Sequence, residues 1–196
     1  MNLLIDALPQ EVTIDGKDYA VNCDFRANLR TILAFEDNDL APQEKQSVMI
    51  ANLYPEIPEN AEAAIERAGW FLNGGREAGE DDATGERLYS FAKDANYIYA
   101  AFKQTHGISL DEVDLHWWVF MALFADLGAD TLFCNLVSLR KRLKDGSATP
   151  EERKMAQSLG EIVDVPELDD RTLDEKEAYE KFMELTRQGT KGGDPL

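Results

Sequence analysis

The sequence predicts a mainly α-helical fold: a compact helical domain with an N-terminal β-hairpin and a less tightly packed C-terminal helical extension. Three observations predict it. Apolar residues recur at spacings of three and four along most of the chain, strict alternation occurs only around Asp15-Gly16, and the composition turns more polar toward the C-terminal end. We therefore expect a helical domain over residues 1–144, a helical extension over 145–188 and a disordered tail over 189–196.

The N-terminal hairpin is predicted from two short apolar runs on either side of a turn. Val12-Thr13-Ile14 alternates, Tyr19-Ala20-Val21 follows after a few residues, and Asp15-Gly16 stands between them. An Asp-Gly pair between alternating runs is typical of a tight two-residue turn. We expect a two-stranded ribbon at about residues 11–22.

The remaining segments predict helices. Start signals are Asp24 as an N-cap, Pro42 and Pro58 at first turns, a capping box beginning at Ser109, and helix starts at Thr149 and Thr172. Gly74-Gly75, Gly107 and Gly128 are the predicted stops. The expected helices are 24–36, 42–54, 58–72, 88–106, one after Ser109 that contains 117–125, 130–144, one from Thr149, and 172–188. Residues 76–87 read as an exposed acidic loop and 161–171 as an extended segment.

Apolar stripes indicate which faces of these helices lie inward. The segment 117–125 is apolar all round, so we expect a central buried helix with Trp117 and Trp118 in the core rather than in a ligand box. Two other stripes are predicted to face the core: Phe25, Leu29, Ile32, Leu33 and Glu36 in one, and Leu132, Phe133, Leu136, Val137, Leu139 and Leu143 in the other. The basic run 140–144 is expected to be a solvated helix end that suits the helix dipole, with nucleic-acid contact as the alternative.

Length and charge restrict the class of protein. The chain has 196 residues, of which 44% are hydrophobic, enough for a buried core and too many for a disordered chain. Its 38 acidic and 20 basic residues give a net charge of -18, which disfavours nucleic acid and anionic membranes because both are polyanions. We expect no nucleic-acid and no membrane partner.

Several features bear on the compartment. No positively charged region precedes the short apolar run at the N-terminus, so no signal peptide is expected. The most apolar stretch, residues 115–127, is shorter than the roughly 20 residues that cross a bilayer. Cys23 and Cys134 lie far apart in no metal-ligand spacing, and we expect two reduced thiols in a reducing cytoplasm.

Residues suited to catalysis are few. His116 is interpreted as a packed or capping histidine, with a general base as the alternative, and His106 precedes a glycine that ends a helix. The acids near His116, namely Asp111, Glu112 and Asp114, form no helix-face pair that would hold a metal. We therefore expect no catalytic residue, no metal site and no cofactor, and we predict that the protein is not an enzyme.

A set of short segments occurs in one order over about residues 8–144: Leu8-Pro9-Gln10-Glu11-Val12-Thr13-Ile14-Asp15-Gly16-Lys17, Asp24-Phe25-Arg26, Tyr54-Pro55-Glu56-Ile57-Pro58-Glu59, Trp70-Phe71-Leu72-Asn73-Gly74-Gly75, Tyr89-Ser90-Phe91-Ala92-Lys93-Asp94-Ala95-Asn96-Tyr97-Ile98-Tyr99 and Leu115-His116-Trp117-Trp118. With this ordered set, the chain resembles the gene-product-fifteen family of phage proteins, which is encoded in the tail-assembly region of long-tailed phages of Gram-positive bacteria.

The resemblance implies a tail assembly chaperone. Such a protein binds the long helical tape measure protein and keeps it soluble until the tail tube polymerises around it. The resemblance also implies a place in the host bacterial cytoplasm, absence from the mature virion and no catalytic residues.

Aromatic and apolar residues outside the core stripes are the predicted partner-binding residues: Tyr89, Tyr97, Tyr179, Phe182 and Met183. A client helix would need such an apolar surface. The protein is also expected to form a homo-oligomer, with the last helix packing on a neighbouring copy rather than on its own domain.

Three other functions stay open. The first is a structural tail or head-tail completion protein that is retained in the virion. The second is an acidic mimic of DNA, disfavoured because the acids are spread through loops and caps instead of forming stripes. The third is an enzyme whose site the sequence does not reveal.

Overall fold

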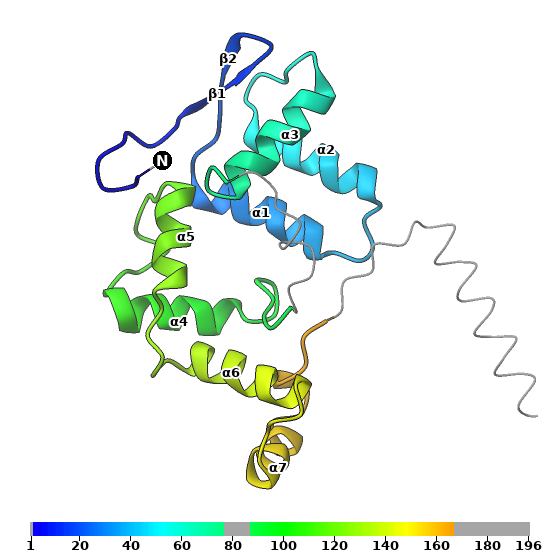
Figure 1. The fold of residues 1–196 in the computed structure, drawn as a ribbon, viewed down its shortest axis with the longest axis vertical. Helices are drawn as coiled ribbons and strands as arrows, with labels where there is room; N and C mark the ends of the chain where they lie inside the picture. Colours follow the sequence, from blue (N-terminus) through cyan, green and yellow to red (C-terminus); the bar gives the residue numbers. More distant parts are fainter. Residues whose placement is uncertain (1, 77–86, 167–196) are drawn as a thin grey trace, which may run out of the picture.

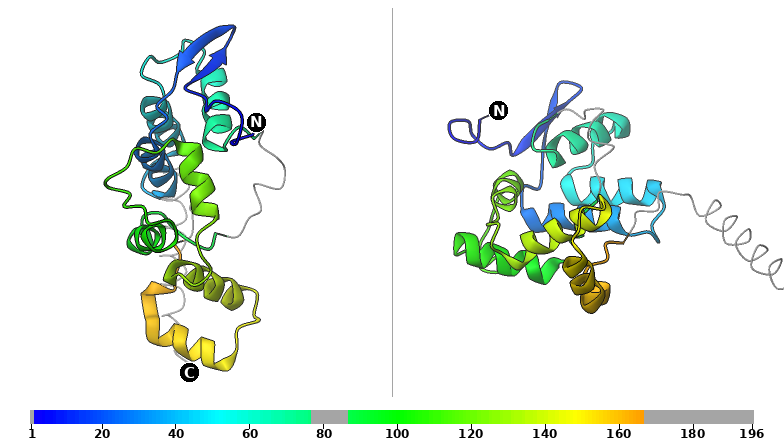
Figure 2. Two further views of the ribbon diagram at one scale, coloured as in Figure 1. Left: turned by 90° about the vertical axis from the view of Figure 1, so that its left-hand side faces the viewer. Right: turned by 60° about the horizontal axis from the view of Figure 1, so that its bottom comes forward.

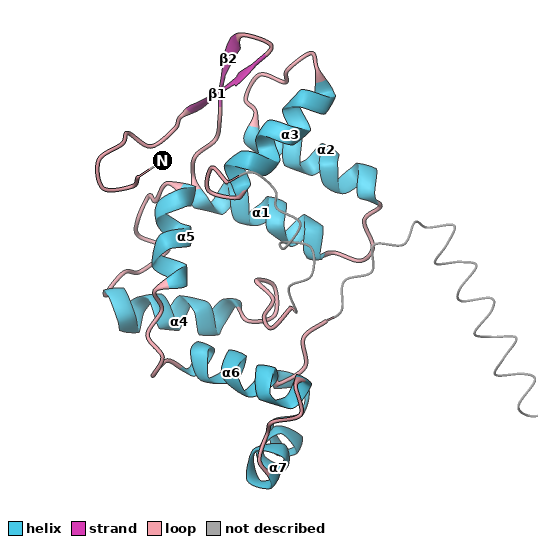
Figure 3. Ribbon diagram, in the orientation of Figure 1, coloured by secondary structure: helices cyan, strands magenta, loops and turns pink. Residues whose placement is uncertain are grey.

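A two-stranded ribbon precedes a series of helices in the computed structural model, which describes residues 2–76 and 87–166 (Figure 1). The strands and α-helices are β1 (Glu11–Ile14), β2 (Lys17–Ala20), α1 (Phe25–Glu36), α2 (Pro42–Leu53), α3 (Ala61–Leu72), α4 (Ala95–His106), α5 (Trp117–Ala125), α6 (Leu132–Lys144) and α7 (Pro150–Leu159), and the 3₁₀ helix Gly160–Ile162 comes after them. The predicted fold class, mainly α with an N-terminal hairpin, is confirmed, as the colouring of Figure 3 makes plain.

The molecule is elongated, with the hairpin at one end and α7 at the other (Figures 1 and 2). Helix α2 packs against α1 and α3, α5 contacts α1 and α4, and α6 joins α4 to α7. Helix α7 buries none of its residues, which fits the predicted looser packing of the C-terminal extension. The division at residue 144 stays a prediction, and the predicted helix 172–188 and tail 189–196 lie outside the described residues. Across the described ranges, no helix is long and apolar enough to cross a membrane.

The hairpin turn has the geometry that its sequence predicts. Asp15 and Gly16 both have positive φ, 50° and 79°, and they join the cross-strand pair Ile14 and Lys17. Two successive left-handed residues give a turn whose twist matches that of the strands. Val12, Ile14 and Tyr19 are buried, and β1 packs against α3.

Two tryptophans attach α5 to the C-terminal end of α3. Both Trp117 and Trp118 are buried, and their Nε1–H groups donate to Leu72 O at 2.9 Å and to Phe71 O at 2.7 Å. These carbonyls are near the end of α3, where partners within the helix run out. A Cβ on Gly75, whose φ is +79°, would lie 2.7 Å from the Trp118 ring, so only glycine fits there. The predicted core role of both tryptophans is confirmed.

The ring of Phe120 connects three helices at the centre of the core. It stacks on Phe25 of α1 at 5.0 Å, on Phe102 of α4 at 5.1 Å and on Trp117 at 5.6 Å between ring centroids. Phe120 itself is 1% exposed. The predicted central role of the 117–125 helix is therefore realised mainly in its first turn, because Ala122 and Ala125 are exposed.

Three predicted helix starts are wrong. Helix α3 begins at Ala61 instead of residue 58, because Asn60 accepts a hydrogen bond from Ala63 N. Helix α5 begins at Trp117 instead of following Ser109, whose Oγ accepts from Lys103 Nζ. Helix α4 begins at Ala95 instead of residue 88, because buried polar contacts hold residues 88–94 in a non-helical turn.

The predicted inward faces also need correction. Leu33 is 38% exposed and Leu132 is 64% exposed, although both were expected in the core. Helix α1 instead buries small and polar residues, Ala27 and Thr31 among them, on the side where α2 packs closely. Leu132 is the first residue of α6, ahead of the turns that contact α4.

We predict that Trp118→Ala destabilises the protein by about 3–5 kcal/mol, because it removes a fully packed aromatic ring and the donor to Phe71 O. Urea unfolding followed by circular dichroism measures this. Leu132→Ala is the control, with an expected loss below about 0.5 kcal/mol at an exposed site. A loss below about 1 kcal/mol for Trp118→Ala would contradict its core role.

Candidate functional site

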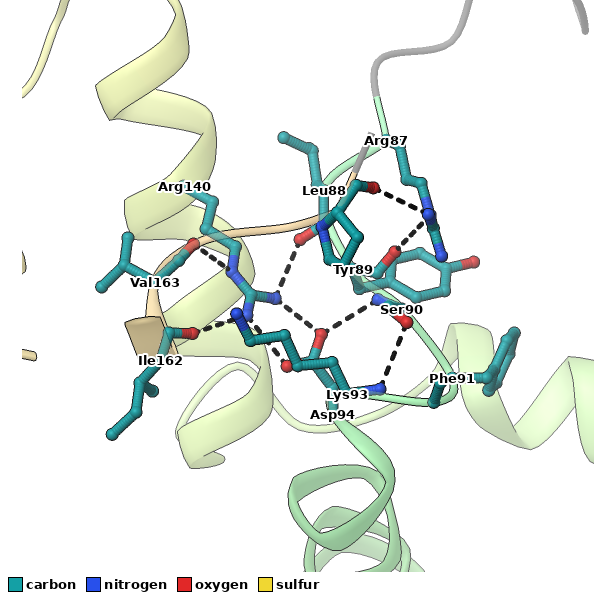
Figure 4. Close-up of polar contacts among 12 residues, drawn as sticks. Arg87, Leu88, Tyr89, Ser90, Phe91, Lys93, Asp94, Arg140, Ile162 and Val163 are labelled. Carbon is teal, nitrogen blue, oxygen red and sulfur yellow. Dashed lines mark hydrogen bonds and ion pairs between the residues drawn. The ribbon is translucent and has the colours of Figure 1, made fainter. Parts of the chain in front are cut away.

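A buried ion pair joins α6 to the turn that precedes α4 (Figure 4). The Arg140 guanidinium binds both carboxylate oxygens of Asp94, Nη1 to Oδ2 at 2.6 Å and Nη2 to Oδ1 at 2.9 Å. The two side chains are 2% and 1% exposed. Two buried charges in this bidentate geometry compensate each other, whereas either one alone would be strongly unfavourable.

Arg140 also binds three backbone carbonyls. Nε donates to Val163 O at 2.9 Å, Nη1 to Leu88 O at 3.1 Å and Nη2 to Ile162 O at 2.8 Å. One side chain therefore fixes the turn before α4 and the chain that comes after α7. The expectation of a solvated basic helix end is wrong at Arg140, although Lys141 and Lys144 of the same run are exposed.

Glu36, the last residue of α1, organises the same turn from the other side. Its carboxylate accepts from Ser90 Oγ at 2.7 Å, from Phe91 N at 3.0 Å and from Ala92 N at 3.2 Å. It also pairs with Arg87 Nη2 at 2.9 Å. An acid at a helix C-terminus is unfavourable toward the helix dipole, and these donors offset that. The turn is thus tied to both α1 and α6.

Arg87 extends this network to the last described residue. Its Nη1 donates to Pro166 O at 2.8 Å, and its Nε donates to Tyr89 O at 3.2 Å. Since Arg87 is itself held by Glu36, the backbone at Pro166 is fixed near the C-terminal end of α1.

An apolar groove lies between α1 and α4 and has a volume of about 220 Å³. Ile98 and Phe120 are buried in its floor, while Leu33 and Tyr99 stand 38% and 39% exposed at its rims. We call it the α1–α4 groove; it is lined by Leu29, Leu33, Phe91, Ala95, Ile98, Tyr99, Leu110 and Phe120. Apart from the Tyr99 hydroxyl, no lining side chain is polar, so the groove suits apolar side chains of a partner.

A second recess adjoins the groove at Leu33, which lines both. It is wider, about 620 Å³, and we call it the Pro166 recess; it is lined by Leu33, Glu36, Asp37, Arg87, Ser90, Ala92, Lys93 and Pro166. The network around Glu36 and Arg87 forms its polar side. The α1–α4 groove and the Pro166 recess are thus neighbours that share Leu33, and the two together are called the depression.

A hydrogen bond holds the Tyr99 rim of the groove. The Tyr99 hydroxyl donates to Asp111 Oδ1 at 2.5 Å. This bond raises the pKa of Tyr99 above its ordinary value and lowers the pKa of the Asp111 carboxyl. Tyr99 is therefore neutral and Asp111 charged at neutral pH, the combination that keeps the bond formed.

Two of the predicted partner-binding residues, Tyr89 and Tyr97, do not line the groove. The Tyr89 ring is half-buried against Phe91, Phe124 and Phe133, with centroids 5.5, 5.3 and 5.9 Å away. Burial is the main cause that raises the pKa of Tyr89. Tyr97 is half-buried against both apolar clusters of the core. Their partner-binding role stays a prediction, and the other three predicted residues, Tyr179, Phe182 and Met183, lie outside the described residues.

Sequence reasoning missed the groove because it assigns Leu29 and Leu33 to a stripe that faces the core. Leu33 follows Ile32 directly in α1, and two large apolar neighbours on a helix point about 100° apart. The stripe of α1 was thus wider than one packed face. That width was the available signal for a second, open apolar surface.

The histidines have structural roles. His116 Nδ1 accepts from Trp118 N at 3.1 Å and caps α5, while its Nε2 lies 2.9 Å from Pro9 O. The capping interpretation of His116 is confirmed. His106 Nε2 lies 2.9 Å from Leu123 O. Within residues 2–76 and 87–166, no group of three or more His, Cys, Asp or Glu residues could hold a metal ion.

These features define a small helical protein whose described surface carries an apolar groove next to a buried polar network. The chain belongs to the phage family described as Bacteriophage Gp15 protein, whose model matches residues 4–165. Membership indicates a phage structural or assembly protein. The match covers the groove, α7 and the carbonyls that Arg140 binds. No curated protein and no solved structure matches the sequence.

We predict that Arg140→Met destabilises the protein by about 3–5 kcal/mol, because Asp94 is left buried without its partner. Arg140→Lys should restore little, since an ammonium cannot bind both carboxylate oxygens and three carbonyls. Chemical unfolding measures both. The matched control is Arg142→Met, which removes a partly exposed pair with Glu152 and should cost less than about 1 kcal/mol. Equal losses at the two arginines would refute the central role of Arg140.

Proposed function

We propose that this chain is a tail assembly chaperone, which binds the phage tape measure protein and keeps it soluble until the tail tube polymerises. It would act in the host bacterial cytoplasm and leave before the virion is complete. The observation that carries the proposal is the α1–α4 groove, an open apolar surface on a strongly acidic member of a phage structural or assembly family.

The shape and chemistry of the groove fit one face of a client helix. Two helices wall it, its floor is apolar, and its rims at Leu33 and Tyr99 are accessible. An amphipathic helix places apolar residues at spacings of three, four and seven along such a groove. A tape measure protein, long and helical with apolar segments, offers many such faces.

The charge of the chain supports the same role. A net charge of -18 keeps complexes apart, because like-charged coats repel one another. Many weak contacts along one long client add together, while each copy can still be displaced singly. The contact itself would be apolar, so it should change little between about 50 and 300 mM salt, where exposed ion pairs are screened.

We predict that Leu33→Asp lowers the soluble fraction of the tape measure protein when the two are co-expressed. The substitution places a carboxylate at the rim of the groove and removes an apolar contact with the client. Loss of one well-packed apolar contact costs about 2 kcal/mol of binding free energy, which is roughly a thirtyfold change in Kd. Leu132→Asp is the matched control, the same change at an exposed leucine of α6 that does not line the groove. An equal loss of client solubility with both variants would remove the groove from the proposal.

A second variant tests the predicted C-terminal residues. Replacing Tyr179, Phe182 and Met183 together by serine lowers client solubility if these residues contact the client, and has no such effect if the groove alone does. Circular dichroism would confirm that the rest of the domain stays folded. If this variant and Leu33→Asp both keep the client as soluble as the wild type does, both proposed surfaces are contradicted.

The content of purified virions separates the chaperone from its main alternative. A chaperone is displaced, so mass spectrometry of virions should find the protein absent or far below the copy number of tail proteins. Stoichiometric retention, together with no effect on the client, would establish instead a structural tail or head-tail completion protein.

A further inference from the structure

The chain leaves the described structure beside the apolar depression. Pro166 lines the Pro166 recess, and the recess meets the α1–α4 groove at Leu33. The sequence continues after Pro166 with residues 167–196, that is 196 − 166 = 30 residues. These residues therefore start within the depression that forms the candidate binding surface.

Two arginines fix this exit point. Arg140, which forms the buried pair with Asp94, binds the carbonyls of Ile162 and Val163, as Figure 4 shows. Arg87 binds the carbonyl of Pro166 at 2.8 Å and is paired with Glu36. The exit is thus held at two points, Ile162–Val163 and Pro166, and Pro166 lies in the recess that Leu33 also lines.

The sequence after the exit carries a matching apolar face. Tyr179, Phe182 and Met183 have the spacing of one helix face, and Thr172-Leu173-Asp174-Glu175 is a capping box that would start a helix. The five residues 167–171 can span up to about 17 Å. A helix over 172–188 would be about 25 Å long, against about 18 Å for the twelve residues of α1. The segment is therefore long enough to lie along the groove.

The charged residues around the depression do not favour a charged partner over the C-terminal segment as the occupant of the groove. The Pro166 recess is lined by two acids, Glu36 and Asp37, and two bases, Arg87 and Lys93, which balance one another. The groove beyond it is apolar except for the Tyr99 hydroxyl. The occupant is thus selected by an apolar face and by proximity, and the tethered segment has both.

In place of the packing on a neighbouring copy that the sequence led us to expect, we propose that residues 172–188 occupy the α1–α4 groove of their own chain and place Tyr179, Phe182 and Met183 in it. A short tether gives an effective concentration on the order of 1 mM, so even a contact with a Kd of about 100 µM would fill the groove in about nine chains of ten. This inference rests on the proposed function: the segment occupies the binding site of a client helix, and the client must displace the segment in order to bind.

Hydrogen–deuterium exchange on the full-length chain without any client tests this occupancy. Replacing Tyr179, Phe182 and Met183 by serine should make the amides of the groove walls, in residues 29–36 of α1 and 95–102 of α4, exchange about tenfold faster. The amides of α3 should not change. The matched control replaces Glu177, Glu180 and Glu184 by serine; these acids lie on the opposite side of the predicted helix, so exchange at the groove should stay as in the wild type.

The reciprocal variant tests the same contact from the groove. Leu33→Asp should speed exchange within residues 172–188, and Leu132→Asp should not. Unchanged exchange at the groove walls in the apolar serine variant overturns the proposal. Protection that grows with protein concentration, together with a dimer mass in light scattering, also overturns it and assigns the groove to the segment of a second copy. Because no client is present, these results stand apart from the client-solubility test of the proposed function.

Discussion

The bidentate pair between Arg140 and Asp94 is the interaction on which the arrangement around the groove depends. The side chains of Arg140 and Asp94 are 2% and 1% exposed, and each buried charge is tolerated only because the other is present. Asp94 ends the turn before α4, so the pair fixes where α4 begins and how it faces α1. The remaining donors of Arg140 hold the carbonyls of Ile162 and Val163. One residue thereby sets a wall of the groove and the path of the C-terminal chain beside it.

The segments that carry the family resemblance meet in space as a framework. Leu115-His116-Trp117-Trp118 contacts Trp70-Phe71-Leu72-Asn73-Gly74-Gly75 through the two indole donors, and His116 reaches Pro9 of the first segment. Tyr54 donates to Ala64 O and so joins α2 to α3. Four of the eight groove residues lie outside these segments: Leu29, Leu33, Leu110 and Phe120. The resemblance therefore rests mainly on residues that hold the scaffold together, while half of the groove lining lies outside it.

Local sequence patterns predicted the elements that local forces decide. Asp15-Gly16 specifies its turn by backbone conformation alone, and Asp24 caps α1 with a bond to the nearby Arg26 N. The start of α4 was predicted seven residues early, because Asp94 finds its partner in Arg140, 46 residues away in the sequence. Leu33 was assigned to the core because periodicity identifies an apolar face without showing whether another element covers it. The candidate groove could therefore be recognised only once α1 and α4 were placed side by side.

An exposed apolar groove favours association with the wrong partners, and the net charge of -18 opposes this only at long range. A tethered occupant acts at short range. It lowers the apparent affinity of every competitor by the fraction of grooves that are open, about tenfold if one groove in ten is free. A weak, adventitious apolar contact is then lost, whereas a long client that engages many copies at once keeps its hold, because its contacts add along one chain. Selectivity for a long helical client would thus follow from multivalency rather than from a tight individual site. Each copy would bind the client weakly enough to be displaced when the polymerising tail tube competes for the same surface of the client.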